Sequence, residues 1–197
     1  MHIVRRRAVL AVAAGLLALP LQAPTGLGHN RPGLEARVQL NESSVRASQE
    51  KQKQALLAAY IASTYRKPYE YAQSIVRVTF EVARQYSLPP SLLLAIMANE
   101  SSFEHGAVSD YGATGLMQVV PRLHLERLEV GETEQSFRNP RTNIRVGADI
   151  LNEYVTREGD LDRALVRYSG NASTYAKRIQ AYWRKLDAVE NLQLELR

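Results

Sequence analysis

Glu100 is the residue whose type and position most directly suggest chemistry. It follows Ile96 by four residues and Leu93 by seven, so its carboxylate falls on the apolar side of a predicted helix, at the C-terminal end. Partial burial penalises the anion, and the negative end of the helix dipole adds to that penalty. We therefore expect a raised pKa for Glu100, toward the range that a general acid needs. A glutamate at a helix end is usually solvated, so position alone does not assign it a role.

The other reactive residue types form no catalytic or metal-binding pattern. The chain has no cysteine, which excludes disulfides, thiol nucleophiles and iron–sulfur clusters. His105 and His124 lack the partners of a zinc site, so we expect no metal and no cofactor. No Gly-Lys-Ser/Thr follows the glycines between residues 106 and 115, which are therefore interpreted as turn formers. Asp110 is interpreted as a turn residue.

The elements that must position Glu100 are helices. From about Tyr71 onward apolar residues recur at helical spacing, interrupted by short segments with glycine and proline. No comparable alternating pattern occurs, so the sequence predicts a mainly α domain over residues 71–187, with at most a small β-hairpin between Gly106 and Val120. Asp160 is a predicted helix N-cap, and Pro90 is predicted in the first turn of the helix that carries Glu100.

The amino terminus has the layout of a secretory signal peptide over residues 1–23. Three arginines precede the apolar run Ala8 to Leu19, which is too short to span a bilayer comfortably. Pro24 would hinder cleavage after Ala23, so an uncleaved anchor stays open. Residues 24–70 are interpreted as a linker, to about residue 41, and a helical arm, from about residue 45. Residues 188–197 are interpreted as a C-terminal tail.

The charge distribution argues against nucleic acid as a partner. The formal net charge is +5, but Arg5, Arg6 and Arg7 supply three of these charges. Residues 71–187 carry 14 basic and 14 acidic side chains. A phosphate-binding surface therefore has no electrostatic support in the predicted helical domain.

The segment that begins at Ala95, AIMANESSFEHGAVSDYGATGLMQVVP, resembles the catalytic segment of the soluble lytic transglycosylase (SLT-type) family, which has a lysozyme-like fold. A second group of matches follows at the family's expected distance. Together the matches place the resemblance over about residues 71–187. They comprise Glu100-Ser101, Phe103, Ala107, Ser109, Gly112-Ala113, Gly115 to Gln118 and Pro121, then Asn143-Ile144, Gly147, Leu151, Ala164-Leu165 and Tyr168-Ser169-Gly170.

The resemblance implies roles for several residues. Glu100 matches the family's single catalytic acid/base, and Tyr168 matches a tyrosine that hydrogen-bonds this glutamate. The remaining matches are expected at the sugar-binding groove: Ser101, Ser109, Met117, Gln118 and Asn143. From the residues alone, Tyr168 fits equally well in the core, Asn143 as a helix N-cap, and Ser101 as a cap of the local backbone.

The activity implied by the resemblance is cleavage of peptidoglycan. Glu100 would protonate the oxygen that bridges N-acetylmuramic acid and N-acetylglucosamine. It would then deprotonate the C6 hydroxyl of the same muramic acid, which closes on C1 and leaves a 1,6-anhydro end. The implied partners are glycan strands, with secretion, conjugation or pilus machinery as a further candidate. We expect a monomer in the periplasm of a Gram-negative bacterium.

The sequence also departs from the family pattern. The usual Tyr-Asn-Ala-Gly is Tyr168-Ser169-Gly170-Asn171 here, Val120 replaces a common methionine, and Leu123 stands near a usual threonine. Two alternatives therefore stay open. One is a lysozyme-like muramidase, in which water attacks. The other is a non-catalytic peptidoglycan-binding scaffold of a secretion or pilus complex.

Overall fold

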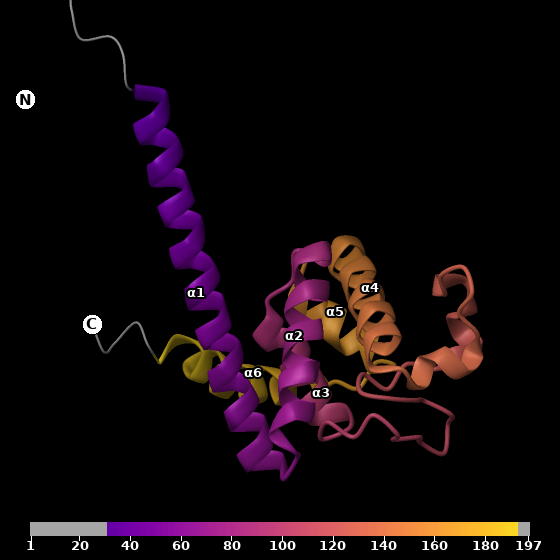
Figure 1. Ribbon diagram of the computed structural model, residues 1–197. Helices are drawn as coiled ribbons and strands as arrows, with labels where there is room; N and C mark the ends of the chain where they lie inside the picture. Colours follow the sequence, from indigo (N-terminus) through magenta and orange to yellow (C-terminus); the bar gives the residue numbers. More distant parts are fainter. Residues whose placement is uncertain (1–30, 193–197) are drawn as a thin grey trace, which may run out of the picture. The chain divides into compact units, whose positions relative to one another are not determined.

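The computed structural model describes residues 31–192, with side chains from residue 36, and this part of the chain is mainly helical (Figure 1). The predicted signal peptide and residues 193–197 lie outside the described residues. The helices are α1 (Arg31–Tyr65), α2 (Tyr69–Tyr86), α3 (Pro90–Glu100), α4 (Pro140–Glu158), α5 (Leu161–Tyr168) and α6 (Tyr175–Asn191), with short 3-10 helices at Pro121–Leu123, Leu125–Arg127 and Glu134–Arg138.

The mainly α class is confirmed, and the hairpin region is even less regular than the sequence allowed. Between residues 31 and 192 no β-strand forms. The segment from Gly106 to Val120 contains two isolated antiparallel bridges, Val108 with Thr114 and Thr114 with Val119. Within the same residues, no helix is both long and apolar enough to cross a membrane.

α3 is the central helix of the compact unit formed by residues 43–197. Residues 91–98 are all buried, because no charged residue interrupts the helix before Glu100. Each leucine or isoleucine buried there contributes about 1.5–3 kcal/mol relative to an exposed side chain. α6 packs against α3, and Trp183 on α6 donates a hydrogen bond to the Ser91 hydroxyl at 3.0 Å. α3 is therefore held rigidly enough to fix the position of its last residue.

The helix ends follow local signals in the sequence. α2 ends at Ser87, which adopts a left-handed φ of 53°, and Pro90 stands in the first turn of α3. Asp160 caps α5 by accepting a hydrogen bond from the Arg163 backbone, as predicted. α4 starts one turn earlier than Asn143, since Asn139 is its N-cap. The N-cap interpretation of Asn143 is therefore wrong.

α1 differs from the expected linker and arm in two ways. It already begins at Arg31, because Pro32 stands in the first turn, where a missing N–H has no helical partner to lose. Residues 31–41 are thus helical, whereas a linker was expected there. The last third of α1 also belongs to the core of residues 43–197, since Leu57, Ala58 and Ile61 have no exposed surface.

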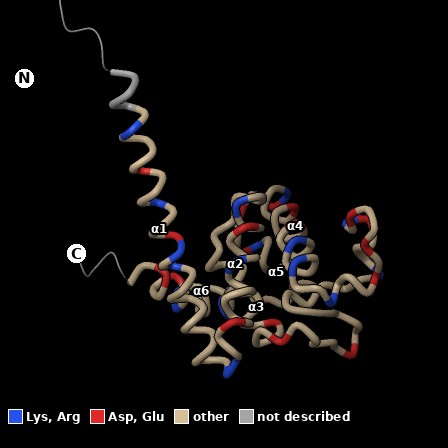
Figure 2. The backbone as a smooth tube through the Cα atoms, viewed as in Figure 1, with Lys and Arg blue, Asp and Glu red and all other residues tan. Residues whose placement is uncertain are grey.

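The charged residues are spread over the helices (Figure 2), where Lys and Arg intermix with Asp and Glu. Many of these charges are paired locally, as in the contacts of Arg84 with Glu50 and of Arg145 with Glu132. α6 continues to Asn191, so the first four residues of the expected tail, 188–191, are helical. The long connection from Ser101 to Asn139 contains 3-10 helices, turns and the two isolated bridges, and it forms one side of the candidate site.

Candidate active site

Glu100 lies at the C-terminal end of α3 and opens onto a cleft of about 510 Å³. The cleft runs between the 106–124 connection and the region where α5 and α6 meet. It is lined by Asn99, Glu100, Ser109, Tyr111, Ala113, Gln118, Val119, Val120, Leu123, His124, Ile150, Tyr154, Arg167, Tyr168, Ser169, Gly170, Ala172, Tyr175 and Arg178. Among these described lining residues Glu100 is the sole carboxylate.

The Glu100 carboxyl group is held by two hydrogen bonds to one of its oxygens. The Tyr175 hydroxyl donates to Oε1 at 2.5 Å, and the Asn99 side-chain amide donates to the same atom at 3.3 Å. Arg178 in turn donates to the Asn99 carbonyl oxygen at 3.3 Å. This chain of contacts orients the carboxyl group and the amide beside it.

Burial raises the pKa of Glu100 above its usual value. The hydrogen bonds from Tyr175 and Asn99 and the positive charge of Arg178 lower the pKa, but burial outweighs them. The carboxyl group therefore stays protonated to a higher pH than a solvated glutamate. This direction agrees with the expectation from its place on an apolar helix face, and it suits a proton donor.

The hydrogen bond to Glu100 that the family resemblance assigned to Tyr168 comes from Tyr175 instead. The Tyr168 hydroxyl donates to the backbone carbonyl of Met117 at 2.9 Å, whereas the predicted hydrogen bond to Glu100 comes from Tyr175. The two rings stack with centroids 6.5 Å apart. Burial, and then the charge of Glu100, raises the pKa of Tyr168, so this hydroxyl stays protonated beside the acid.

Tyr175 escaped the sequence analysis because an aromatic residue at helical spacing indicates only burial. It is 2% exposed and is the first residue of α6. The available signal was the short distance along the chain: Tyr175 follows Tyr168 by seven residues. Only a short turn joins the end of α5 to the start of α6, so the two tyrosines lie close together. Tyr111, which is 66% exposed at the cleft, gave no signal in the sequence either.

Ser109 and Gln118 line the cleft, as expected of groove residues. The Gln118 amide donates to the backbone carbonyls of Gly115 at 3.0 Å and Ala107 at 3.3 Å, so the side chain closes the loop on itself. The Ser109 hydroxyl accepts a hydrogen bond of 3.0 Å from the Ala113 backbone. Both residues therefore shape the loop that carries them and also line the cleft.

Asn143, Met117 and Ser101 lie behind the cleft and do not line it. Asn143 is fully buried: its carbonyl oxygen accepts from the Met117 backbone at 2.8 Å, and its amide donates to the carbonyls of Thr114 and Phe137. The Ser101 hydroxyl bonds the Leu116 carbonyl at 2.8 Å, in line with a role in orienting the backbone. The prediction that Asn143 contacts the substrate directly is therefore wrong, because its side chain is buried and its polar atoms are hydrogen-bonded inside the protein.

Two glycines make this support possible. A Cβ atom on Gly115 would lie 2.4 Å from the Asn143 amide nitrogen, and Gly115 also has a φ of +81°. A Cβ atom on Gly147 would lie 2.7 Å from the sulfur of Met117. The loop therefore packs directly on the backbone of α4.

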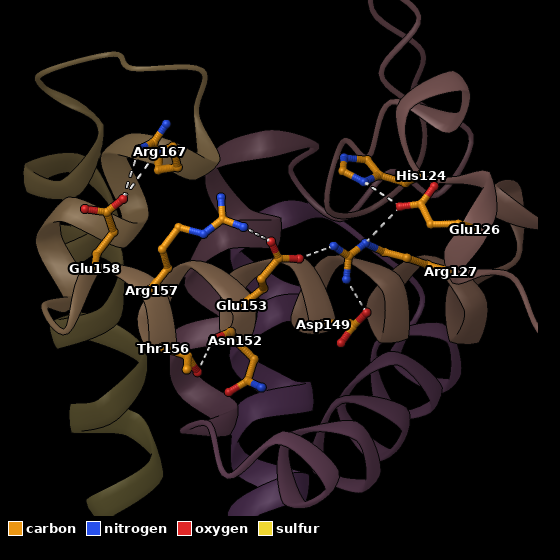
Figure 3. A network of polar contacts seen from close by, with 10 residues as sticks. All are labelled: His124, Glu126, Arg127, Asp149, Asn152, Glu153, Thr156, Arg157, Glu158 and Arg167. Carbon is orange, nitrogen blue, oxygen red and sulfur yellow. Dashed lines mark hydrogen bonds and ion pairs between the residues drawn. The ribbon is translucent and has the colours of Figure 1, made fainter.

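A network around Arg127 fastens the next part of the cleft wall to α4 (Figure 3). Arg127 pairs with Asp149 and Glu153 of α4 and lies 3.5 Å from Glu126. His124, which lines the cleft, is anchored in the same segment. Burial and the charge of Arg127 lower the pKa of His124, which favours the neutral imidazole.

The described residues contain no cluster of three or more His, Asp or Glu side chains that could hold a metal ion. The chemical capacity of the cleft lies in one buried carboxyl group, two tyrosine hydroxyls and a set of polar and aromatic residues around them. This arrangement can donate a proton to a bound substrate and take one back.

Comparison with known proteins places the chain among transglycosylases. A transglycosylase of Enterobacteria phage PRD1 is 33% identical over 112 residues, which are 56% of this chain and 40% of that protein. The membrane-bound lytic murein transglycosylase C of Actinobacillus pleuropneumoniae is 34% identical over 108 residues, 50% of this chain and 29% of that protein. The chain thus spans less than half the length of these relatives.

A solved structure has the same fold. The X-ray structure of an inactive mutant of lytic transglycosylase Slt from Pseudomonas aeruginosa superimposes with a TM-score of 0.52 at 22% identity, covering 60% of this chain and 24% of that one. Residues 77–189 match the family described as "Transglycosylase SLT domain", which is more than half of the chain. The protein therefore belongs to the SLT-type transglycosylase family, and the resemblance noted in its sequence is confirmed.

Proposed function

We propose that the protein is a peptidoglycan lytic transglycosylase with Glu100 as its single acid/base. The observation that carries this proposal is the Glu100 carboxyl group, buried with a raised pKa and held by Tyr175 in a cleft where it is the sole carboxylate among the described lining residues. Glycosidases that use two carboxylates keep them about 5–5.5 Å or 6.5–9.5 Å apart. A cleft with one acid suits a mechanism in which the substrate supplies its own nucleophile.

The proposed reaction has two proton transfers through the same carboxyl group. Protonated Glu100 gives its proton to the oxygen that joins muramic acid C1 to N-acetylglucosamine, and the C1–O bond breaks. The acetamido group of the muramic acid stabilises the positive charge at C1. The Glu100 carboxylate then takes the proton of the C6 hydroxyl as O6 bonds to C1. Glu100 ends protonated, and no water is consumed.

The surroundings of Glu100 support both steps. Both hydrogen bonds reach Oε1, so Oε2 is the oxygen that would exchange the proton. Tyr168, Ser109, Gln118 and exposed Tyr111 offer hydroxyl, amide and ring surface for sugar contacts along the cleft. Ser101, Met117 and Asn143 would serve the site only by holding its loop.

The cellular setting is proposed on the same basis. The name of the relative from Actinobacillus pleuropneumoniae refers to murein, the peptidoglycan of the cell wall. A protein that cleaves it must be exported, and the periplasm is the compartment we propose. Glycan strands are the proposed partner, and assembly with secretion, conjugation or pilus machinery stays a prediction.

The test is mass spectrometry of muropeptides released from purified peptidoglycan by the wild type and by Glu100→Gln. We expect products one water lighter than those of a lysozyme, and their loss by about 10²–10⁴-fold in the variant. Reducing ends that contain water would make the protein a muramidase. Equal binding of peptidoglycan by both proteins without any cleavage would favour the scaffold.

A further inference from the structure

The turn that follows Glu100 is strained at two consecutive residues. Ser102 has a φ of 48° and Phe103 a φ of 61°, both in the left-handed region that residues with a Cβ atom avoid. Neither position holds a glycine, so the chain does not relieve the strain. Backbone strain of this kind persists only where the surrounding structure enforces it.

The strained turn determines where Glu100 stands. The backbone N–H groups of Ser101 and Phe103 both bond the carbonyl of Met97, at 3.1 and 3.5 Å, and so end α3 directly at the acid. The reversal sends the Phe103 ring into the core, where it has no exposed surface. A turn that relaxed to ordinary φ values would move Phe103 and, with it, the last turn of α3.

The groups that enforce the turn come from the α1–α2 junction, by which we mean the side chains of Tyr65, Lys67 and Tyr71. The Tyr65 ring contacts the Phe103 ring edge to face, with centroids 4.8 Å apart. The Tyr71 hydroxyl donates a hydrogen bond of 2.9 Å to the Phe103 carbonyl. Lys67 pairs with Glu104 at 2.9 Å. The junction thus contacts the ring of Phe103, its backbone carbonyl and the next residue, Glu104.

This junction lies before residue 77, where the family match begins, and it is not part of the cleft lining. We propose that the α1–α2 junction positions Glu100 by holding the strained Ser102–Phe103 turn, with Tyr71 and Tyr65 as positioning residues. The inference rests on the proposed function, because it assigns the junction to the acid of that reaction.

The alternative is that the junction only adds stability, as the buried Leu57 and Ile61 of α1 do. The two explanations differ in what a mild variant changes. A purely structural contact alters the free energy of unfolding and leaves the acid as it was. A positioning contact alters the burial of Glu100 and therefore its titration and the rate of the chemical step.

The experiment uses Tyr71→Phe in the full chain, with Tyr69→Phe as the matched control. Tyr71→Phe removes one hydroxyl and keeps the ring, whereas Tyr69 is exposed on the same helix and lines no cleft. We expect Tyr71→Phe to lower kcat roughly tenfold with little change in KM, since a small displacement of an acid costs rate more than binding. The control should match the wild type.

A titration that needs no turnover separates this inference from the proposed function. In protein labelled with ¹³C at glutamate carboxyls, Glu100→Gln identifies the Glu100 signal. Tyr71→Phe should lower the pKa of Glu100 toward its usual value, because a relaxed turn admits water to the carboxyl group. If the wild type cleaves no peptidoglycan, the proposed function fails, and this titration still tests the junction.

A rescue variant keeps the proposal open to refutation if Tyr71→Phe is poorly folded. Ser102 is exposed, and Ser102→Gly removes the Cβ atom from a left-handed position. The double variant should regain much of the lost rate and the raised pKa if Tyr71 acts by holding the strained turn. An unchanged pKa of Glu100 in Tyr71→Phe, or no rescue by Ser102→Gly, would overturn the proposal.

Discussion

The Tyr175 hydroxyl donates a hydrogen bond of 2.5 Å to Glu100 Oε1, and it joins the first residue of α6 to the last residue of α3. The contact orients the carboxyl group while burial keeps its pKa raised. Tyr168 lies beside it but bonds the loop on the other side of the cleft. Tyr175 therefore orients the acid, and Tyr168 holds the loop that carries Met117.

Removing the Tyr175 hydroxyl should change the pH dependence of activity in a defined direction. This hydrogen bond lowers the pKa of Glu100, so Tyr175→Phe should raise that pKa further. The fall in rate at high pH should therefore begin at a higher pH. We also expect a loss of roughly tenfold or more in kcat, because the carboxyl group is less well oriented.

Tyr168→Phe is the matched control for this prediction. This variant also removes a hydroxyl, from the neighbouring ring. The hydroxyl of Tyr168, however, donates to the Met117 carbonyl and not to Glu100. Tyr168→Phe should lower activity without moving the high-pH limb of the pH–rate profile to higher pH. Equal shifts in both variants would contradict the distinct roles of the two tyrosines.

Ionisation of Glu100 should destabilise the fold. A raised pKa means that the folded state binds the proton more tightly than the unfolded chain, whose pKa is near 4.5. The stabilising effect of the proton is complete below pH 4.5 and is lost as the pH rises through the folded-state pKa. Glu100→Gln mimics the protonated acid, so it should raise Tm near pH 7 and leave it almost unchanged near pH 4. Thermal unfolding at both pH values tests this, and an equal effect at both would contradict it.

Gly115→Ala should strongly destabilise the protein. Its Cβ atom would collide with the Asn143 amide and the Phe137 carbonyl, and its φ would be strained. We expect a loss of about 3 kcal/mol or more in the free energy of unfolding. Gly106→Ala is the control, because its Cβ atom would meet nothing closer than 3.7 Å. Denaturant unfolding of both variants checks the difference, and a similar stability for the two would be inconsistent with the packing described here.

Tyr111 should act on substrate binding and not on stability. Its exposed ring lies at the cleft, with the Arg122 guanidinium 4.2 Å from the ring centroid. Tyr111→Ala should raise KM for glycan strands several-fold and change the free energy of unfolding by no more than about 0.5 kcal/mol. Kinetics on soluble glycan strands, with unfolding as the parallel measurement, test this. A fall in kcat at constant KM would exclude the role.

The sequence was informative where one residue type in one place has one physical meaning. Pro90 and Asp160 mark helix starts because of their backbone and side-chain chemistry, and both predictions are confirmed. Glu100 drew attention because a carboxylate on an apolar helix face is costly, and the resemblance to the SLT-type family then implied its role as the acid.

The sequence was ambiguous where a residue type serves two purposes. Asparagine caps helices and also bridges buried backbone groups, and Asn143 does the second. The family resemblance assigned the hydrogen-bond partner of Glu100 to Tyr168. The sequence pattern could not correct this, because it gives spacing along a helix but not the angle at which α6 returns to α3. Only the packing of the two helices selects Tyr175.

Gly147 lies so close to Met117, and Gly115 so close to Asn143, that neither position has room for a Cβ atom. At Gly147 a larger residue can fit only if Met117 becomes smaller at the same time, so these two positions are expected to change jointly during divergence. At Gly115 the Phe137 backbone carbonyl would still collide with the Cβ atom, so this position is expected to stay glycine.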